Sequence, residues 1–395
     1  MGSFGLGIVA FYLNFLYRGL GFAEAQIGAL AAAQAVGALA SAYPSSRFAA
    51  AHTRRASLLV GGTVVGAGVC GILLLDSLPA LVLSSALLGG GGLLVASSGA
   101  ALLADASSDL YRFRLFGQQV AIGTSAAFVA STLAGALAVP IAALLGVPPG
   151  DVRTMRFRVG LGSLVALASG LPVLLLRRAP IARRRQEGQV RASVIKRFLA
   201  VELAWGFGAG SFMPFQNLFF ADRFGLPFAG LGVVLGALAV AGSLGALTHG
   251  RLLVPAIGFR GAFGATVLAS IPFVLIGAAA AALPVVAGVF AARTALVYGA
   301  AASYRAYTLA SFTSAERVGA FVTLAIAYNA ALATASLLSG TIRSALGDVG
   351  WSVNLVLLCA FYALAAVLVH RLFVRHAPTG DLAGAEAGPA RDSSV

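Results

Sequence analysis

The chain has 395 residues, of which 59% are hydrophobic and only 10% are charged, and its mean hydropathy is +0.93. A soluble domain needs more polar surface than this, so the composition excludes an ordinary water-soluble protein. The net charge of +14 does not indicate a nucleic-acid partner, because the basic residues form short clusters between long apolar runs, as in membrane-protein loops. Cys70 and Cys359 lie inside apolar runs without metal-ligand spacing, so we expect no disulfide, metal or cofactor.

Twelve apolar runs are long enough to cross a membrane as helices, which takes about 20 residues at about 1.5 Å per residue. A β-barrel is excluded because the runs are too long and do not alternate. The sequence therefore predicts an all-α integral membrane protein with twelve transmembrane helices. In chain order the predicted spans are 2–18, 25–44, 57–75, 80–104, 115–139, 158–176, 198–220, 227–247, 262–282, 284–305, 318–342 and 351–373.

The distribution of Lys and Arg predicts how these spans are oriented. Most basic residues fall in one set of alternate loops, whereas the opposite set holds few, among them Arg18, Arg223 and Arg343. Cytoplasmic loops carry the excess of Lys and Arg, so both termini are expected inside, in a bacterial cytoplasmic membrane. The basic loop 177–197 is expected to anchor the topology at anionic lipid, and the tail 374–395 to be disordered.

The chain also contains an internal repeat. The segment FYLNFLYRGLGFAEAQIG (11–28) resembles the segment that begins FQNLFFADRFGLP (215–227), and ordered matches continue at offsets of 203 to 205 residues. We therefore predict two parallel halves of six helices, 1–176 and 198–373, related by a pseudo-twofold axis along the membrane normal. The matched pairs include Asn14 with Asn217, Gly28 with Gly232, Ser131 with Ser336 and Gly135 with Gly340.

The loop after span two reads SRFAAAHTRR (46–55), and its repeat reads GRLLVPAIGFR (250–260). With the 6+6 plan and the loop after span four, ADASSDLYRFRLFG (104–117), these segments resemble the major facilitator superfamily, whose signature loop is roughly G-R-L-A-D-R-x-G-R-R. Ala50 replaces the acidic residue of that signature. The resemblance implies secondary transport and cytoplasmic gate loops at Arg47, Arg54, Arg55, Arg112, Arg251, Arg260 and Arg317.

Ionisable residues inside a span are functional candidates, because a charge in hydrocarbon needs a partner or water. We predict that Arg293, deep in span ten, is a cation in the cavity that binds an anionic substrate; the alternative is an arginine packed against another helix. We predict that Glu202, one turn into span seven, is a protonation site for coupling to a proton gradient; the alternative is a carboxylate that reaches the membrane–water interface. Glu24 is interpreted as a helix cap, and Asp222 as part of the external corner of span seven.

Uncharged polar residues within the spans are candidates for the substrate cavity, although hydrogen bonds between helices would also explain each of them. These candidates are Asn14, Gln34, Gln119, Thr124, Gln216, Asn217, Tyr298, Tyr328 and Asn329.

These features predict a secondary transporter that works by alternating access, not an enzyme. The sequence contains no G-x-x-x-x-G-K-[ST] loop, so ATP-driven pumping by this chain alone is not expected. The apolar composition favours efflux of a hydrophobic or amphipathic compound, with an anionic group for Arg293, by a monomer in contact with lipid. Proton coupling is left open. The alternatives are uptake or facilitated diffusion of a sugar or organic anion, and a non-transporting receptor or assembly protein.

Overall fold

The computed structural model describes residues 2–105, 109–174, 191–312 and 316–373. These residues form α-helices and one short 3-10 helix, η1, without a strand. The described ranges leave out the predicted tail and residues 177–190 of the predicted central loop, whereas 192–197 belong to α9. The elements are α1 Gly2–Gly19, α2 Glu24–Ala51, α3 Arg54–Leu74, α4 Leu78–Asp105, α5 Asp109–Ala136, α6 Ala138–Leu145, α7 Val152–Ala168, α8 Leu171–Leu174, α9 Ala192–Phe212, η1 Met213–Phe215, α10 Gln216–Phe224, α11 Phe228–Ala279, α12 Leu283–Ser311, α13 Arg317–Leu346 and α14 Val349–Leu372.

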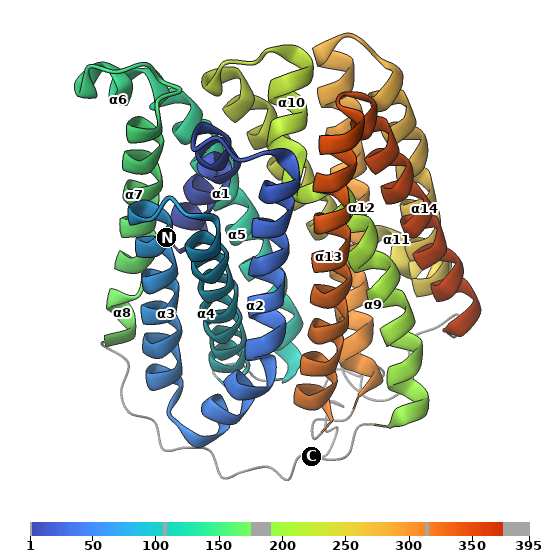
Figure 1. Ribbon diagram of the computed structural model, residues 1–395. Helices are drawn as coiled ribbons and strands as arrows, with labels where there is room; N and C mark the ends of the chain where they lie inside the picture. The colour runs from blue at the N-terminus through green and yellow to red at the C-terminus, as the bar shows by residue number, and fades with distance from the viewer. Residues whose placement is uncertain (1, 106–108, 175–190, 313–315, 374–395) are drawn as a thin grey trace, which may run out of the picture.

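The helices gather in two groups that stand side by side. Helices α1–α8, the first group, lie on the left of Figure 1, and α9–α14, the second group, lie on the right. Among the described residues, nine helices are long and apolar enough to cross a membrane, or ten if the bent pair Ser125–Ala136 and Ala138–Leu145 is one span. The all-α membrane class is therefore confirmed, whereas the count of twelve spans remains a prediction.

We name the two ends of the helix bundle by the segments that lie there. The gate end contains the turn between α1 and α2, residues Gly19–Glu24, and lies at the top of Figure 1. The linker end contains Leu174, the end of α8, and Ala192, the start of α9.

Several helix boundaries differ from the predicted spans. Helix α11 runs through two of them and breaks at Gly258, whose φ of 72° is readily adopted only by glycine. Helix α7 begins at Val152, because the Asp151 side chain caps it by accepting a hydrogen bond from the Arg153 amide at 2.7 Å. The prediction began only at residue 158, because Arg153 and Arg156 interrupt the apolar run before it.

Span seven is divided into two helices. Helix α9 ends at Phe212, η1 covers Met213–Phe215, and α10 continues from Gln216. Pro214 lies inside this break, where a residue without a backbone N–H costs no helical hydrogen bond. The break exposes the Pro214 carbonyl, which accepts a hydrogen bond from Asn14 of α1 at 2.6 Å.

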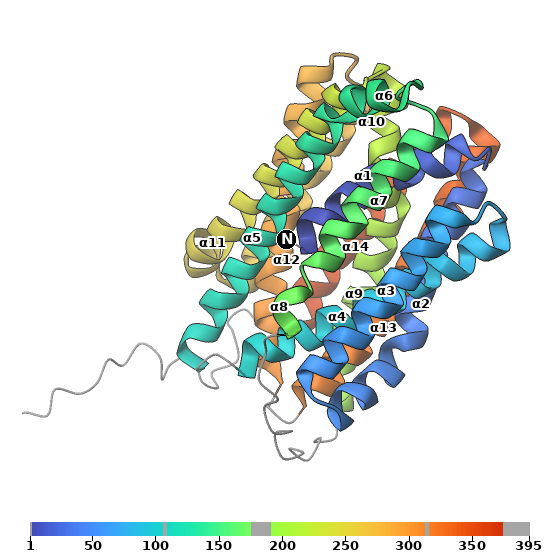
Figure 2. The ribbon, with the colours of Figure 1, turned by 90° about the vertical axis from the view of Figure 1, so that its left-hand side faces the viewer.

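Glycines meet at both of the main contacts between the two groups. The main contacts between the groups join α2 to α13 and α5 to α11, and Figure 2 shows both pairs side by side. A Cβ atom on Gly28 of α2 would lie 3.0 Å from the Cα of Gly340 on α13, and one on Gly232 of α11 would lie 3.1 Å from the Cα of Gly135 on α5. The first pair matches the second in the predicted repeat, so the two contacts are related by the predicted pseudo-twofold axis.

Candidate functional site

A cavity of about 350 Å³ lies between the two groups. Helices α1, α2 and α5 of the first group line it, together with η1, α10 and α11 of the second. Its wall is largely apolar, with Phe11, Leu30 and Leu235 among the lining residues. Four of the predicted cavity residues also line it: Asn14, Gln34, Gln216 and Asn217.

Two of these amides hydrogen-bond to each other across the boundary between the groups. Nδ2 of Asn14 donates to Oδ1 of Asn217 at 2.8 Å, while Nδ2 of Asn217 donates to the carbonyl of Phe11 at 3.1 Å. Asn217 is buried and Asn14 is half-buried. The asparagines thus form one wall of the cavity and at the same time join α1 to α10.

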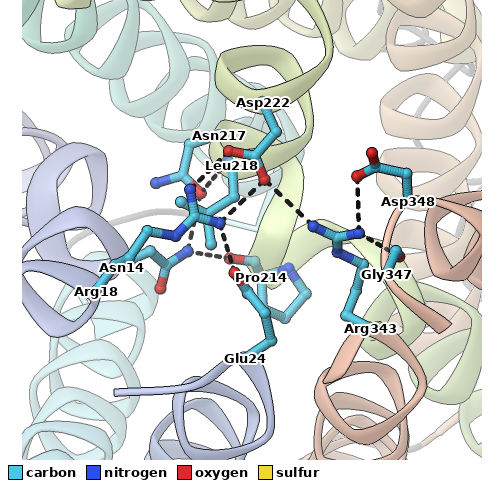
Figure 3. A network of polar contacts seen from close by, with 10 residues as sticks. All are labelled: Asn14, Arg18, Glu24, Pro214, Asn217, Leu218, Asp222, Arg343, Gly347 and Asp348. Atoms are coloured by element: carbon cyan, nitrogen blue, oxygen red, sulfur yellow. Dashed lines mark hydrogen bonds and ion pairs between the residues drawn. The ribbon is translucent and has the colours of Figure 1, made fainter. Parts of the chain in front are cut away.

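An ion-pair network lies toward the gate end from these amides (Figure 3). Arg18, near the end of α1, donates through Nη1 and Nη2 to the two carboxylate oxygens of Asp222 on α10, at 2.6 and 3.0 Å. Its Nη2 also pairs with Glu24 at 2.5 Å. Glu24 was expected as a helix cap; it instead helps to hold the arginine that joins the two groups.

Asp222 also belongs to a second branch of this network. Arg343 of α13 lies 3.4 Å from Asp222 and 3.3 Å from Asp348 (Figure 3). Its guanidinium also stacks over the Trp351 ring, 4.3 Å from the ring centre. Asp222 therefore accepts from arginines of both groups. We call Arg18, Glu24, Asp222 and Arg343 the gate.

A buried arginine makes a further contact between the groups. Arg158 of α7 donates to the carbonyls of Ala138 and Pro149, the latter at 3.0 Å. Its guanidinium lies 5.0 Å from the Tyr12 ring centre of the first group and 5.6 Å from that of Phe228 in the second. These contacts leave only Nε of Arg158 without a hydrogen-bond partner, and they fix α7 against α11.

Arg293, the predicted cavity cation, lies behind the cavity wall. Its side chain is 0% exposed, and Nη1 is 3.3 Å from Sδ of Met213, which lines the cavity. The guanidinium also lies 5.4 Å from the centre of the Tyr362 ring. Its Nε and Nη2 atoms have no hydrogen-bond partner, and no carboxylate among the described residues pairs with it. Only one side chain therefore separates this charge from the cavity.

Glu202, the predicted coupling residue, lies in α9 toward the linker end and is half-buried. It interacts electrostatically with Arg305, an exposed residue of α12. Tyr304 and Tyr328 lie within electrostatic range of the same carboxylate. The structure thus places Glu202 in a polar cluster of the second group, away from the cavity-lining residues.

The other predicted cavity residues are not among those that line the cavity. Gln119 is exposed, and Tyr298 is 37% exposed. The Asn329 amide donates to the Ala325 carbonyl one turn earlier at 2.8 Å. The side chain of Thr124 lies outside the described residues.

The predicted cytoplasmic gate loops contain other residues than the four that we call the gate. Arg47 is exposed and stacks on Tyr43 with 5.4 Å to the ring centre, and Arg260 lies 3.2 Å from His370. Both contacts stay within one group. Arg54 and Arg55 are half-buried and Arg251 is exposed, whereas the side chains of Arg112 and Arg317 lie outside the described residues.

The residues of the gate were not predicted as site residues. From the sequence, Arg18 and Arg343 were counted only as loop charges, and Asp222 was interpreted only as part of a helix corner. A usable signal existed, because Arg18 and Asp222 have opposite charges and lie 204 positions apart, at the offset of the repeat. Residues that correspond under a twofold axis can meet on that axis.

A bundle of apolar helices in two groups, with a cavity between them, has the architecture of a membrane transporter and not of an enzyme. Residues 1–304 match the model of the Major Facilitator Superfamily, and the chain therefore belongs to this family of membrane transporters. No match was found among curated protein sequences.

Solved structures of the same fold cover nearly the whole chain. A bacterial homologue of the iron transporter ferroportin, inward-facing, aligns with a TM-score of 0.69 and 16% identity, over 94% of this chain and 95% of the other. A bacterial homologue of the human lysosomal transporter Spinster gives 0.67 and 15%, over 93% and 96%. The human organic anion transporter MFSD10 gives 0.62 and 16%, over 93% and 97%. At these identities the likeness shows the fold alone.

Proposed function

We propose that this protein is a secondary transporter that exports a small hydrophobic or amphipathic molecule by alternating access. The observation that carries the proposal is the position of the gate: ion pairs from both groups close over a cavity that both groups line. If the groups rock against each other, the Arg18–Asp222 pair must break before the cavity can open at the gate end.

The predicted orientation supports export. The excess of basic residues in the loops of the linker end makes that end cytoplasmic, so the gate end faces outward. With the gate closed, a solute would enter the cavity from the cytoplasm. The largely apolar wall, with four amides and the hydroxyls of Tyr17 and Ser131, favours a mainly apolar solute with a few polar groups. Uptake of a polar solute through the same cavity is the alternative.

A reversible cross-link across the gate tests this proposal. In a background without Cys70 and Cys359, the pair Arg18→Cys and Asp222→Cys is bridged by a short reducible bis-thiosulfonate reagent. Proteoliposomes are then assayed with rhodamine 6G, fluorescein and Nile red as amphipathic probes. We expect movement of the accepted dye to stop on cross-linking and to resume on reduction.

The matched control cross-links two residues of one group at the same end of the bundle. Asp76 and Arg156 form an ion pair within the first group, with side chains 67% and 28% exposed. Bridging cysteines at these two positions should leave dye movement unchanged. Undiminished transport in fully cross-linked Arg18→Cys/Asp222→Cys protein would contradict a moving gate, and transport of no probe in either direction would favour a non-transporting role.

A further inference from the structure

The guanidinium of Arg293 presents one unpaired edge. Nη1 faces the sulfur of Met213, whereas Nε and Nη2 lack hydrogen-bond partners. Nε–H and the adjacent Nη2–H lie side by side on one edge of the planar group, where a carboxylate binds through both of its oxygens. The orphaned atoms are therefore the pair that a single anionic group would satisfy.

The contacts that Arg293 does make leave its charge poorly compensated. A thioether sulfur is a weak hydrogen-bond acceptor, and an arginine stays protonated in proteins. The Tyr362 ring, 5.4 Å away, supplies a cation–π contact but no negative charge. Arg158, which is 2% exposed, also has an unpaired Nε, but both of its terminal nitrogens donate to backbone carbonyls and it lies near two rings. This difference indicates that Arg293 is placed to bind a group that does not belong to the described residues.

Met213 controls access to this edge from the cavity. It lines the cavity, contacts Arg293 at 3.3 Å and begins η1, at the break between α9 and α10. Methionine has three rotatable bonds, so its side chain can swing aside without backbone movement. Such a movement would join the Arg293 pocket to the cavity.

We infer that Arg293 and Met213 form a subsite for the anionic headgroup of the transported molecule, a carboxylate or a similar acid. The headgroup displaces the Met213 sulfur and accepts hydrogen bonds from Nε and Nη2, while the apolar part lies against Phe11, Leu30 and Leu235. The assignment to a transported molecule rests on the proposed function; anion binding at Arg293 does not.

Tryptophan fluorescence gives a binding readout that is independent of transport. Trp205 stacks on Tyr362 with ring centres 4.9 Å apart, and Tyr362 lies beneath Arg293. The only other tryptophan, Trp351, lies at the gate, so Trp351→Phe leaves a reporter beside the subsite. Purified Trp351→Phe protein is titrated with octanoate, octylamine, octanol and sodium chloride. Only octanoate should give a saturable change in Trp205 emission.

Arg293→Met and Met213→Leu test the two members of the subsite. Arg293→Met keeps an unbranched side chain and removes an uncompensated charge, so it should fold and melt no lower than the parent. We expect it to weaken octanoate binding at least about tenfold, the loss typical of a charged hydrogen bond. Met213→Leu replaces the flexible side chain by a branched one and should slow octanoate association. Arg223→Gln removes an arginine that binds two carbonyls elsewhere and should bind octanoate like the parent.

The possible results separate the subsite from the proposed function. Equal octanoate affinity in the parent and Arg293→Met overturns the subsite. A chloride response as strong as that of octanoate overturns the assignment to a substrate headgroup. Octanoate binding that depends on Arg293, without movement of octanoate in proteoliposomes, would retain the anion site and contradict its assignment to a transported molecule. Transport restricted to neutral or cationic dyes and unchanged in Arg293→Met would retain the transporter and overturn this inference.

Discussion

Asn14 and Asn217 correspond to each other in the repeat and hydrogen-bond directly, with 2.8 Å between Nδ2 of the first and Oδ1 of the second. Their second contacts are reciprocal as well. Asn14 donates to the carbonyl of Pro214, and Asn217 donates to the carbonyl of Phe11, which lies 203 positions earlier than Pro214. The predicted pseudo-twofold axis therefore passes between the two amides.

This reciprocity predicts similar effects of Asn14→Ala and Asn217→Ala. Each substitution leaves one amide without its partner, which costs about 1–3 kcal/mol for a buried group. The double variant should cost less than the sum of the single variants, since no orphaned amide remains, with a coupling of at least about 0.5 kcal/mol. Melting temperatures of the four proteins in one detergent check this, and strictly additive shifts would contradict a direct bond.

Asp222→Asn should favour opening at the gate end. The substitution removes the charge that pairs with Arg18 across the two groups, and a partly exposed pair of this kind contributes about 0.2–1 kcal/mol; the Arg343 pair lies within the second group. A change of up to about 1 kcal/mol shifts the ratio of closed to open protein by up to roughly fivefold. The readout is labelling of Gln34→Cys, a cavity position, by an impermeant maleimide added from the gate-end side in a cysteine-free background.

Asp348→Asn is the matched control for this experiment. Asp348 contacts the same Arg343 at 3.3 Å, but its side chain is 96% exposed and it lies in the same group as Arg343. Its neutralisation should leave the labelling of Gln34→Cys unchanged. Equal labelling rates in the Asp222→Asn, Asp348→Asn and parent proteins would show that the gate does not hold the groups together.

The glycine contacts predict a second way to open the same end. A Cβ on Gly340 would lie 2.5 Å from the Glu24 carbonyl, and one on Gly135 would lie 2.4 Å from the Phe228 carbonyl. Overpacking of this kind costs typically about 1–3 kcal/mol, and here the strain falls on the gate-closed arrangement. Gly340→Ala and Gly135→Ala should therefore raise labelling of Gln34→Cys by similar factors.

Gly92→Ala provides the control for the glycine variants, since a Cβ there meets nothing within 4 Å. It should label like the parent and melt at the same temperature or slightly higher, because alanine favours a helix over glycine. Normal labelling of Gly340→Ala would indicate that α2 and α13 adjust to the extra methyl group without opening the gate.

The sequence was informative about Arg293 and uninformative about the gate for one physical reason. A charge inside an apolar run is conspicuous whatever the rotation of its helix, so Arg293 could be singled out without coordinates. The gate depends on how α1, α10 and α13 are turned about their axes, because only that rotation brings Arg18 and Arg343 to Asp222. Hydropathy fixes the lengths of spans but not their rotation.

The break at Met213–Phe215 shows a similar limit. Pro214 was visible in the sequence, yet a proline in a membrane helix is tolerated when neighbouring groups satisfy the freed carbonyls. The missing N–H of Pro214 frees the Gly210 carbonyl, which accepts from the Ser336 hydroxyl at 3.4 Å. Whether the helix continues therefore depends on partners from elsewhere in the chain; the Pro214 carbonyl itself accepts from the Asn14 amide at 2.6 Å. The repeat placed Asn14 and Asn217 at corresponding positions, but their direct contact required the two groups to meet on the axis.

Glu202 supplies the last prediction, which concerns energy coupling. Arg305 of α12 offers it a positive charge, and Tyr304 and Tyr328 lie near it. If protons drive export, Glu202 must bind and release a proton in each cycle, so Glu202→Gln should abolish uphill dye movement driven by an imposed pH gradient. Downhill exchange of the same dye should persist, because neither the cavity nor the gate contains Glu202.

Asp76→Asn is the control that distinguishes loss of proton coupling from a general effect of removing a negative charge. Asp76→Asn removes an acid whose side chain is 67% exposed, so it should retain both uphill and downhill movement. Glu202→Gln protein that still concentrates dye against its gradient would remove Glu202 from the coupling step. Loss of both activities would instead assign it a structural role with Arg305. Only selective loss of uphill movement requires a proton on this carboxylate, since both substitutions remove one negative charge and only Glu202 lies within the helix bundle.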